Sequence, residues 1–232
     1  MKLSVIIPAL NEAENIGAAC LSATGAHEVI VADGGSVDGT AGIARSFGAS
    51  VVSAERGRGA QMDAGAAVAT GDAFVFLHAD TTLPFGWALP VEAALGRNGV
   101  VAGAFCLAIG SPRSRFRFVE AAVSLRCRAL GLVYGDQALF ASRDAFFRAG
   151  GFNRLPLMED VDCVKRLRRL GGVELLREAV TTSPRRWESR GLLGASLANI
   201  AMLLLYHAGV SPRRLRNWYY GPAPDRARFD RD

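Results

Sequence analysis

The sequence has almost no lysine and carries little charge for its length. Only Lys2 and Lys165 are lysine among the 27 Lys and Arg residues, so arginine carries the formal net charge of +5. Charged residues make up 21% of the 232 residues, and hydrophobic residues make up 50%. This balance excludes a disordered chain, a collagen-like repeat and a polytopic membrane protein. A chain of this length can bury a sizeable core as one α/β domain, alone or with an appendage.

Cysteine is also scarce. The four cysteines (Cys20, Cys106, Cys127 and Cys163) are widely spaced and form no CxxC pair. They therefore indicate neither a disulfide framework nor a zinc site. We interpret them as small buried hydrophobic residues in a reducing cytoplasm, which predicts a cytoplasmic protein. The short apolar run before Pro8 is typical of a first strand and not of a secretory signal.

The sequence lacks a run of about 20 strongly apolar residues, the length that spans a bilayer. The nearest candidate, 191–212, contains no charged residue but is diluted by Gly, Ala, Ser and Asn. Three interpretations stay open. The segment packs on the domain or on a second copy in a homodimer, it contacts a membrane surface through 191–220, or it spans the membrane. The second interpretation would place the protein at the inner face of the membrane.

Apolar runs alternate with helical patterns along the first half of the chain. Strands are expected at 3–8, 28–32, 50–53 and 73–78, and helices at 11–24, 38–47 and 59–69. This alternation predicts a Rossmann-like, mostly parallel sheet flanked by helices. Further strands are expected at 100–109 and 138–142, and helices at 87–97, 114–130 and 159–170. The predicted organisation is a domain at 1–190, with a nucleotide-binding half (1–98) and an acceptor half (99–190), followed by a basic helical segment at 191–232.

Charged residues stand at the carboxyl ends of the first four strands, where open α/β sheets bind ligands. Three ends carry an acid and the other carries two arginines, as suits a ligand with a base, phosphates and a divalent cation. Asp33 is placed to accept from a ribose hydroxyl or a base N–H, or to form a turn with Ser36. Arg58 is suited to clamp a diphosphate, or lies solvated on the surface.

Two further acidic groups suggest a reaction centre. Asp80 follows a strand and offers the hard oxygen that Mg²⁺ or Mn²⁺ prefers, with His78 as an alternative second ligand or a core histidine. Glu159 and Asp160 begin a predicted helix, where acids are favoured by the helix dipole. They are either ordinary N-terminal acids or a general base beside a phosphate-rich site.

Together these runs resemble family 2 glycosyltransferases of the GT-A fold. The motifs that carry the resemblance are Val5 to Glu12, Val31 to Thr40, His78-Ala79-Asp80 in place of the family's Asp-x-Asp metal motif, Gly135-Asp136-Gln137, Glu159-Asp160, and Arg185-Arg186-Trp187. The resemblance covers residues 3–190. It is specific as a set, although each motif alone is weak.

The resemblance implies an inverting transfer of one sugar from a nucleotide-diphosphate sugar, with UDP-sugars favoured, to the hydroxyl of an unidentified acceptor. Asp160 would act as the general base with Glu159 beside it, and Asp80 would hold Mg²⁺ or Mn²⁺, with His78 as an alternative second ligand. The nucleotide site would consist of Pro8, Ala9, Leu10, Glu12, Asp33, Ser36, Arg58, Gln61 and Ala79. The acceptor site would contain Asp136, Gln137, Arg186 and Trp187.

Several alternatives are weighed against this hypothesis. A sugar nucleotidyltransferase usually has a Gly-rich loop with Arg and Lys after its first strand, where this chain has Asn11 and Glu12. A non-catalytic nucleotide-sugar-binding protein stays open because His78 replaces the first Asp of the metal motif. The adjacent Arg185 and Arg186 lack the spacing of processive synthases, which favours single-sugar transfer. Nucleic acid is not expected as a partner, because the apolar residues of the basic helix 114–130 form a packing face.

Overall fold

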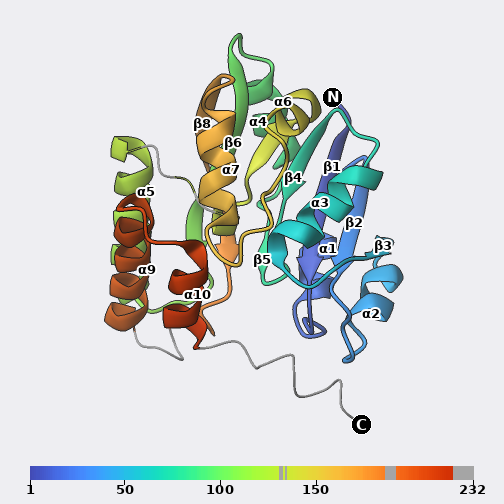
Figure 1. The fold of residues 1–232 in the computed structure, drawn as a ribbon. Coiled ribbons are helices and arrows are strands. Elements are labelled where there is room, and N and C mark those ends of the chain that lie inside the picture. The colour runs from blue at the N-terminus through green and yellow to red at the C-terminus, as the bar shows by residue number, and fades with distance from the viewer. Residues whose placement is uncertain (131–132, 134, 186–191, 222–232) are drawn as a thin grey trace. The chain divides into compact units, whose positions relative to one another are not determined.

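A computed structural model describes residues 1–130, 133, 135–185 and 192–221 (Figure 1). The chain divides into two compact units. The first contains Met1–Arg154 and Glu159–Pro184, and the second contains Leu155–Met158 and the described residues from Arg185 onward. The predicted division of 1–190 into a nucleotide half and an acceptor half stays a prediction.

One sheet of eight strands forms the centre of the first unit. Its strands are β1 (Leu3–Ala9), β2 (Glu28–Asp33), β3 (Ser50–Ser53), β4 (Ala73–Phe76), β5 (Thr81–Thr82), β6 (Val100–Ile109), β7 (Phe140–Ser142) and β8 (Gly172–Thr182). Their order across the sheet is β3-β2-β1-β4-β7-β6-β8-β5. The neighbours from β3 to β4 are parallel, as are β6 and β8, whereas β7 and β5 run antiparallel to their neighbours. The predicted mostly parallel α/β sheet is therefore confirmed.

Helices flank this sheet. The first unit contains α1 (Ile16–Ser22), α2 (Thr40–Ser46), α3 (Arg58–Val68), α4 (Ala88–Leu95), α5 (Arg115–Leu130), the 3-10 turn η1 (Gly135–Gln137), α6 (Arg143–Arg148) and α7 (Glu159–Leu167). Helix α3 packs on β1 and β2 and also contacts α7. These two helices therefore cover the same face of the sheet, toward the viewer in Figure 1.

The register of β1 explains why its loop belongs to the site. All seven residues of β1 are buried, as expected for an apolar strand covered on both faces. Ile6 pairs with Ile30 of β2 and with Phe76 of β4, and Ala9 pairs with Asp33. The carboxyl ends of these parallel strands therefore meet at one edge of the sheet, the lower edge in Figure 1.

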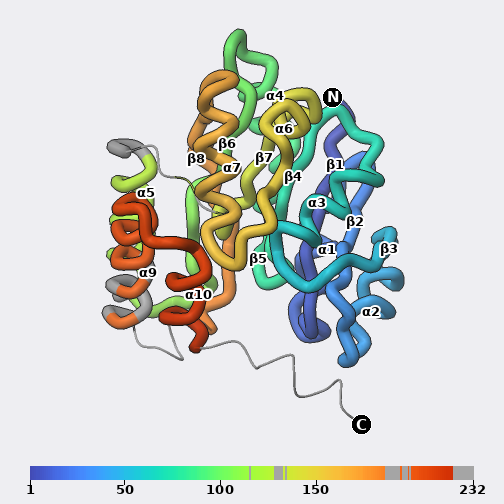
Figure 2. The backbone as a smooth tube through the Cα atoms, in the orientation of Figure 1, coloured from blue at the N-terminus to red at the C-terminus, as the bar shows by residue number. Residues whose placement is uncertain are grey.

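The reversed strand β7 brings a distant turn to this edge. β7 lies between β4 and β6 (Figure 2), and Phe140 pairs with both Val75 and Gly103. A Cβ at Gly103 would lie 2.3 Å from the Phe140 ring and 2.5 Å from the Glu174 carbonyl oxygen, so this position accepts only glycine. Because β7 is antiparallel to β4, the turn η1 just before it lies beside the end of β4.

Phenylalanine side chains fill the core between the sheet and the segment around α6. Phe76 packs against Phe152 with ring centroids 4.9 Å apart at 87°, and Phe74 packs against Phe146 at 5.5 Å and 87°. Full burial of one such side chain contributes about 1.5–3 kcal/mol. This core fixes the loop that leads from α6 toward α7.

Several details differ from the sequence prediction. Strand β4 ends at Phe76, two residues before the predicted end, and β7 begins at Phe140 instead of residue 138. Three cysteines are buried as predicted. Cys106 is only half-buried, and its thiol donates a hydrogen bond to the Leu176 carbonyl oxygen. Burial raises the pKa of the Cys20 thiol to about 11 and that of Cys163 to about 12, so both stay protonated near neutral pH.

The second unit contains α9 (Leu192–His207) and α10 (Pro212–Tyr220), which contact each other. Helix α10 begins with Pro212 at its first position, where the missing N–H costs nothing. Within the described ranges, no helix is both long and apolar enough to cross a membrane.

Candidate active site

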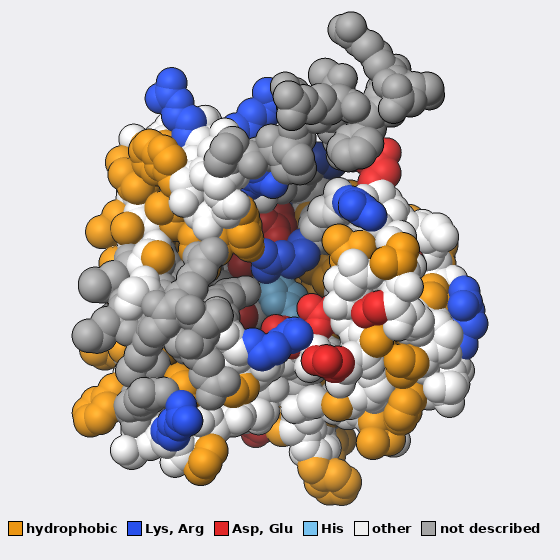
Figure 3. All heavy atoms as spheres, turned by 90° about the horizontal axis from the view of Figure 1, so that it is seen from below, with side chains coloured by type: hydrophobic (Ala, Val, Ile, Leu, Met, Phe, Trp, Pro, Cys, Tyr) orange, Lys and Arg blue, Asp and Glu red, His pale blue; other side chains and the backbone are white. Residues whose placement is uncertain are grey.

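Polar side chains gather at the edge where β1, β2 and β4 end. Figure 3 views this edge from below and shows acidic side chains gathered around a histidine near its centre. Three elements bring side chains to this edge within the first unit: the loops after the parallel strands, the turn η1, and the first turn of α7.

The loops after β1 and β2 are joined by direct hydrogen bonds. The Asn11 N–H donates to Ser36 Oγ at 2.9 Å, and the Val37 N–H donates to Asn11 Oδ1 at 3.0 Å. Asn11 has a φ of +54°, a left-handed conformation that asparagine tolerates better than most residues. We call these two segments, residues 11–13 and 36–40, the loop pair.

Asp38 completes the loop pair. Its Oδ2 accepts from the Ala13 N–H at 3.0 Å, and its Oδ1 accepts from the Thr40 hydroxyl at 2.5 Å and the Thr40 N–H at 3.0 Å. The Thr40 hydroxyl and then the Ala13 N–H hold the pKa of the Asp38 carboxyl below its usual range. Thr40 Oγ1 in turn accepts from the Glu12 N–H at 2.9 Å. Asp38 thus fixes both loops before any ligand arrives.

Asp33 is predicted to accept a hydrogen bond from the nucleotide or to form a turn with Ser36, and the structure shows the turn. Its carboxylate accepts from the Gly35 N–H at 3.2 Å and the Ser36 N–H at 3.1 Å. Gly35 has a φ of +88°, which only glycine adopts easily. The carboxylate still has lone pairs for a ligand, so its contact with a nucleotide stays a prediction.

Gln61 supports the strand ends from within. Its side chain is 3% exposed, and its Nε2 donates to the carbonyl oxygens of Ala9 at 2.7 Å and Ala32 at 3.0 Å. Both amide hydrogens are therefore used to join the ends of β1 and β2. Gln61 positions the nucleotide edge, and a direct contact with nucleotide would have to come from its carbonyl oxygen.

The other residues predicted to bind nucleotide lie at the same edge. Pro8 and Ala9 are the last two residues of β1 and are buried, Leu10 is exposed, and Ala79 is buried in the loop after β4. The Glu12 carboxylate accepts from the side-chain amide of Asn15 at 2.7 Å. Their roles stay predictions.

Asp80 lies beside a small pocket. Its carbonyl oxygen accepts from the Ser183 N–H at 2.9 Å, which ties the loop after β4 to the end of β8. The Thr81 hydroxyl donates to Thr182 Oγ1 at 3.0 Å in the same wall. The pocket has a volume of about 210 Å³, and eight of its twelve lining residues carry a side-chain oxygen. Such hard donors suit Mg²⁺ or Mn²⁺.

Asp160 meets His78 across Gly135. The Asp160 Oδ2 accepts from the Gly135 N–H at 2.5 Å, and Oδ1 accepts from the Val161 N–H at 2.8 Å. A Cβ at Gly135 would lie 3.1 Å from both Asp160 Oδ2 and His78 Nε2. The missing side chain at Gly135 therefore makes room for both groups, and two backbone donors orient the carboxylate.

Glu159 is buried beside Arg58. Its side chain is 7% exposed, and its Oε1 lies 3.6 Å from Arg58 Nε. Burial raises the pKa of the Glu159 carboxyl. The Arg58 guanidinium lowers this pKa, and the negative charge of nearby Asp160 raises it further. Helix α3 comes this close because residue 59 is glycine, where a Cβ would lie 3.0 Å from the Asn153 carbonyl oxygen. Arg58, predicted to meet a diphosphate, thus also holds α7 in place.

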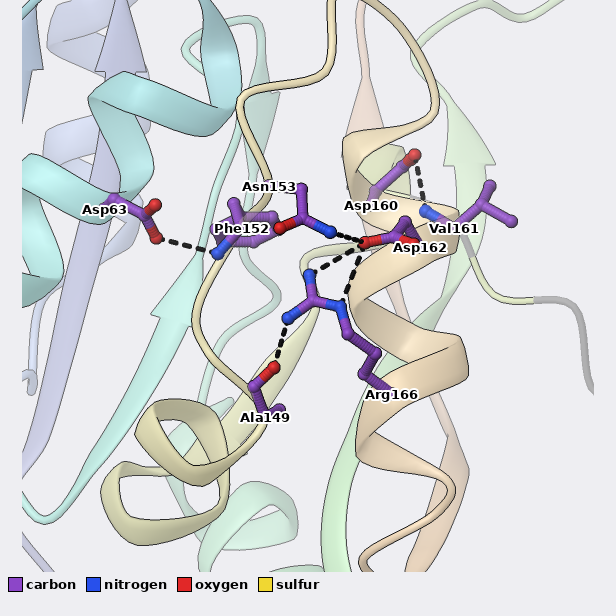
Figure 4. Close-up of polar contacts among 8 residues, drawn as sticks. All are labelled: Asp63, Ala149, Phe152, Asn153, Asp160, Val161, Asp162 and Arg166. Atoms are coloured by element: carbon purple, nitrogen blue, oxygen red, sulfur yellow. Dashed lines mark hydrogen bonds and ion pairs between the residues drawn. The ribbon is translucent and has the colours of Figure 1, made fainter. Parts of the chain in front are cut away.

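Asp162 points away from Asp160 into a separate polar network (Figure 4). Its Oδ2 accepts from Asn153 Nδ2 at 2.7 Å and from Arg166 Nε at 2.9 Å, and Arg166 also donates to the Ala149 carbonyl oxygen. The three acids in the first turn of α7 therefore differ. Asp162 is neutralised by an arginine, and Asp160 is held by backbone donors.

Asp63 of α3 fixes the loop of residues 149–153 from the side opposite α7. The Asp63 Oδ1 accepts from the Phe152 N–H at 2.8 Å, and burial raises the pKa of the Asp63 carboxyl. With Asn153 bonded to Asp162, successive residues of this loop are held by α3 and α7.

The predicted acceptor residues divide into three groups. Asp136 is half-buried in η1, next to Gly135. Gln137 is fully buried, donates to the Phe105 carbonyl oxygen at 3.0 Å and accepts from the Cys127 thiol at 3.3 Å. In this structure it therefore supports the turn from below. Arg186 and Trp187 lie outside the described residues.

Sequence reasoning missed the residues that act through the backbone. The N–H of Gly135 orients Asp160, and the left-handed Asn11 joins the loops. The Gly135-Asp136-Gln137 motif draws attention to its polar side chains, whereas the backbone N–H of its glycine is the group that contacts Asp160.

Comparison with known proteins agrees with this arrangement. A family model described as glycosyl transferase family 2 matches residues 4–153, more than half of the chain. None of the curated proteins matches this chain in sequence.

Solved structures share the fold. Glucosyl-3-phosphoglycerate synthase from Mycobacterium tuberculosis, in complex with phosphoglyceric acid, is 23% identical with a TM-score of 0.65, over 90% of this chain and 80% of that chain. The same synthase with Mn²⁺, UDP-glucose and glycerol 3-phosphate is 24% identical with a TM-score of 0.62 over the same shares. TarS 1-349 from S. aureus, with UDP-GlcNAc, is 17% identical with a TM-score of 0.61, over 79% of this chain and 58% of that chain.

At these identities the solved structures establish the fold, which confirms the predicted GT-A architecture. Membership is established by the family match, which contains the loop pair, Gln61, Asp80 and Gly135. The chain belongs to glycosyl transferase family 2.

Proposed function

We propose that this protein is an inverting glycosyltransferase that moves one sugar from a nucleotide-diphosphate sugar to an acceptor hydroxyl. The observation that carries the proposal is that Asp160 Oδ2 and His78 Nε2 both lie beside Gly135, while His78 belongs to the loop after β4 that also contains Asp80. A base and a hard-oxygen donor at one strand edge are what such a displacement needs.

The donor site is proposed at the loop pair. The hydrogen bonds of the loop pair fix the backbone after β1 and β2. The Asp33 carboxylate, at the end of β2, accepts from the Ser36 N–H and so closes the turn between them. The solved relatives include complexes with UDP, UDP-glucose and UDP-GlcNAc, which supports a UDP-sugar as donor. Arg58 is proposed to contact the diphosphate, at the expense of its ion pair with Glu159.

The residues present fit a divalent cation that is shared with phosphates. Among the described residues, no three His, Cys, Asp or Glu side chains form a cage. Mg²⁺ is usually bound by one or two carboxylates together with substrate phosphates, so Asp80 is sufficient on the protein side. Solved relatives hold Mn²⁺ or Mg²⁺ with UDP. The ion would neutralise charge on the departing diphosphate.

Asp160 is proposed as the general base that accepts the proton of the acceptor hydroxyl. Its two oxygens are oriented by the N–H groups of Gly135 and Val161, so the carboxylate is held in place before the acceptor binds. Such a base contributes on the order of 10²–10⁴ in rate. Glu159 is proposed to act on the reaction through Arg58 and α7, and Asp136 to border the acceptor.

A thermal-shift panel of nucleoside diphosphates, with and without Mn²⁺, tests the donor site. Binding to the folded state raises stability by RT ln(1 + [L]/Kd), so UDP with Mn²⁺ should raise Tm more than UDP alone. Asp80→Ala should remove the Mn²⁺-dependent part, and Asp144→Ala, on the exposed surface of α6, should leave it unchanged. No shift with any nucleoside diphosphate would overturn the proposed function.

Hydrolysis of the nucleotide sugar, followed by release of UDP, distinguishes a transferase from a binding protein. The proposal expects slow release of UDP from at least one UDP-sugar, with Asp160→Asn slower still. If the wild type and Asp160→Asn both bind the nucleotide sugar and neither releases UDP, the result favours a non-catalytic nucleotide-sugar-binding protein.

We also propose a cytoplasmic location. The support is chemical, because all four cysteines are free thiols in the structure.

A further inference from the structure

The exposed side chains of α10 include arginines and aromatic residues. Arg213, Arg214, Trp218 and Tyr220 are all exposed, and Trp218 is 61% exposed. Leu215 is fully buried on the opposite side of the helix. Arg214 and Trp218 are four residues apart and lie next to each other on one side of α10, whereas Arg213 and Tyr220, seven residues apart, lie together on another side.

Helix α9 exposes two large apolar side chains. Ile200 and Leu204, again four residues apart, are 52% and 64% exposed. No charged residue occurs from Leu192 to Tyr206. We call six of the exposed side chains of the two helices the helix-pair surface: Ile200, Leu204, Arg213, Arg214, Trp218 and Tyr220. Exposed apolar groups on one helix and exposed cationic groups on the helix that it contacts are typical of a unit that meets another phase or partner.

We infer that the helix-pair surface docks on an anionic lipid bilayer. Trp and Tyr are favoured at the boundary between headgroups and acyl chains, and arginines close to an anionic surface add electrostatic attraction. A helix that lies in this boundary needs a cationic polar side and a few apolar groups, and it does not need the length of a span. The composition of α9 and α10 satisfies both conditions.

Charge complementarity favours a bilayer over the other occupants. Residues 185–232 contain nine arginines and four acids, and no acid occurs among the described residues of the second unit. Two copies of one cationic surface would repel each other, which disfavours a homodimer through it. A nucleic acid would satisfy the arginines but would leave the aliphatic side chains of Ile200 and Leu204 without a partner.

Co-sedimentation of the full chain with vesicles tests the inference. Vesicles of equal parts phosphatidylcholine and phosphatidylglycerol should bind the protein, and phosphatidylcholine vesicles should bind at least about tenfold less. Binding should weaken as salt rises, because screening shortens the reach of the arginines. Lack of binding to the anionic vesicles, or equal binding to both, would overturn the inference.

Charge reversal locates the contact. Arg213→Glu with Arg214→Glu should lower binding at least about tenfold. The matched control is Arg168→Glu with Arg169→Glu, an exposed adjacent pair in the first unit with the same change in net charge. If the control lowers binding equally, net charge and not this surface is responsible, and the inference fails.

Trp218 supplies a readout that does not depend on net charge. Its fluorescence should shift to the blue with anionic vesicles, and the shift should be lost in Trp218→Phe. Trp218→Ser should weaken binding several-fold while circular dichroism stays unchanged. Persistence of the full shift in Trp218→Phe would contradict the inference. So would displacement of the vesicles by a DNA oligonucleotide, or a change in the oligomeric state of Trp218→Ser in sedimentation velocity.

Discussion

The two sides of the site are built by different physical means. At the loop pair, polar side chains accept from backbone N–H groups of their own loop and of the neighbouring loop, and the pKa of Asp38 is lowered as a result. At the first turn of α7, an acid is buried beside one arginine, and the pKa of Glu159 is raised. The first side has a fixed backbone ready for a ligand, and the second holds one buried acid, Glu159, whose charge is costly. We therefore expect binding defects from one side and rate defects from the other.

The largest effect is expected at Asp160. Asp160→Asn should lower kcat on the order of 10²–10⁴, because the amide does not take the acceptor proton. The change should leave the Tm shift with UDP and Mn²⁺ intact. The matched control is Asp162→Asn in the same turn, which loses its contacts with Arg166 and should lower Tm with kcat nearly unchanged. Equal loss of kcat in both variants would contradict the difference between the two acids.

Gly135→Ala tests whether orientation of Asp160 matters separately from its charge. The added Cβ would lie 3.1 Å from both Asp160 Oδ2 and His78 Nε2, so these groups must move. Misplacement of this size should lower kcat by about tenfold to a hundredfold. Steady-state kinetics should show the loss in kcat more than in KM for the donor. Unchanged kcat would mean that the carboxylate does not need this position.

Asp38→Ala probes the other side. Without its carboxylate the loop pair loses the acceptors for Ala13 and Thr40, so the donor KM should rise by about threefold to tenfold, with little change in kcat. Val37→Ala, at the exposed neighbouring position, is the control and should leave KM unchanged. A defect confined to kcat would remove the distinction between binding and rate.

The smallest effect is a pH-dependent stability change in Glu159→Gln. Because the pKa of Glu159 is raised in the folded protein, the folded state binds more protons than the unfolded state above the ordinary value of 4.5. Wild-type stability should therefore fall relative to the variant as pH rises from there toward the raised pKa. Differential scanning fluorimetry should show a Tm difference that moves in the variant's favour as pH rises, by about 2–4 °C for each 1 kcal/mol of relative stability. An advantage that shrinks with rising pH would reverse the sign argued here.

The first half of the fold was predictable because its strands are continuous apolar runs with turn residues at their ends. Residues 3–8 and 28–32 match β1 and β2 to within one residue. β8 was missed because its buried and exposed residues follow no simple alternation, with a register irregularity opposite Ala104 to Cys106. Its pairing with β6 is a long-range property that local patterns do not contain.

The positions of the candidate site residues at strand ends and at a helix start were predictable, and their roles stay predictions. Asp33, Asp80 and Asp160 stand where the motifs placed them, at the carboxyl edge or the helix start. The division of work among the acids of α7 was not predictable, because it depends on Arg58 and Arg166, which come from different elements. Gln61 shows the same limit, since its partners are carbonyl oxygens of two other strands.

The parallel pairing of β6 with β8 has a consequence for synthesis of the chain. Residues 100–109 leave the ribosome well before residues 172–182, with which they pair from Val100–Gly172 to Ile109–Thr182. During that interval one edge of β6 has its backbone donors and acceptors open, in an apolar ten-residue strand. A nascent chain stalled before residue 172 therefore exposes an edge that favours intermolecular pairing. Aggregation during expression should depend on how quickly translation passes this point.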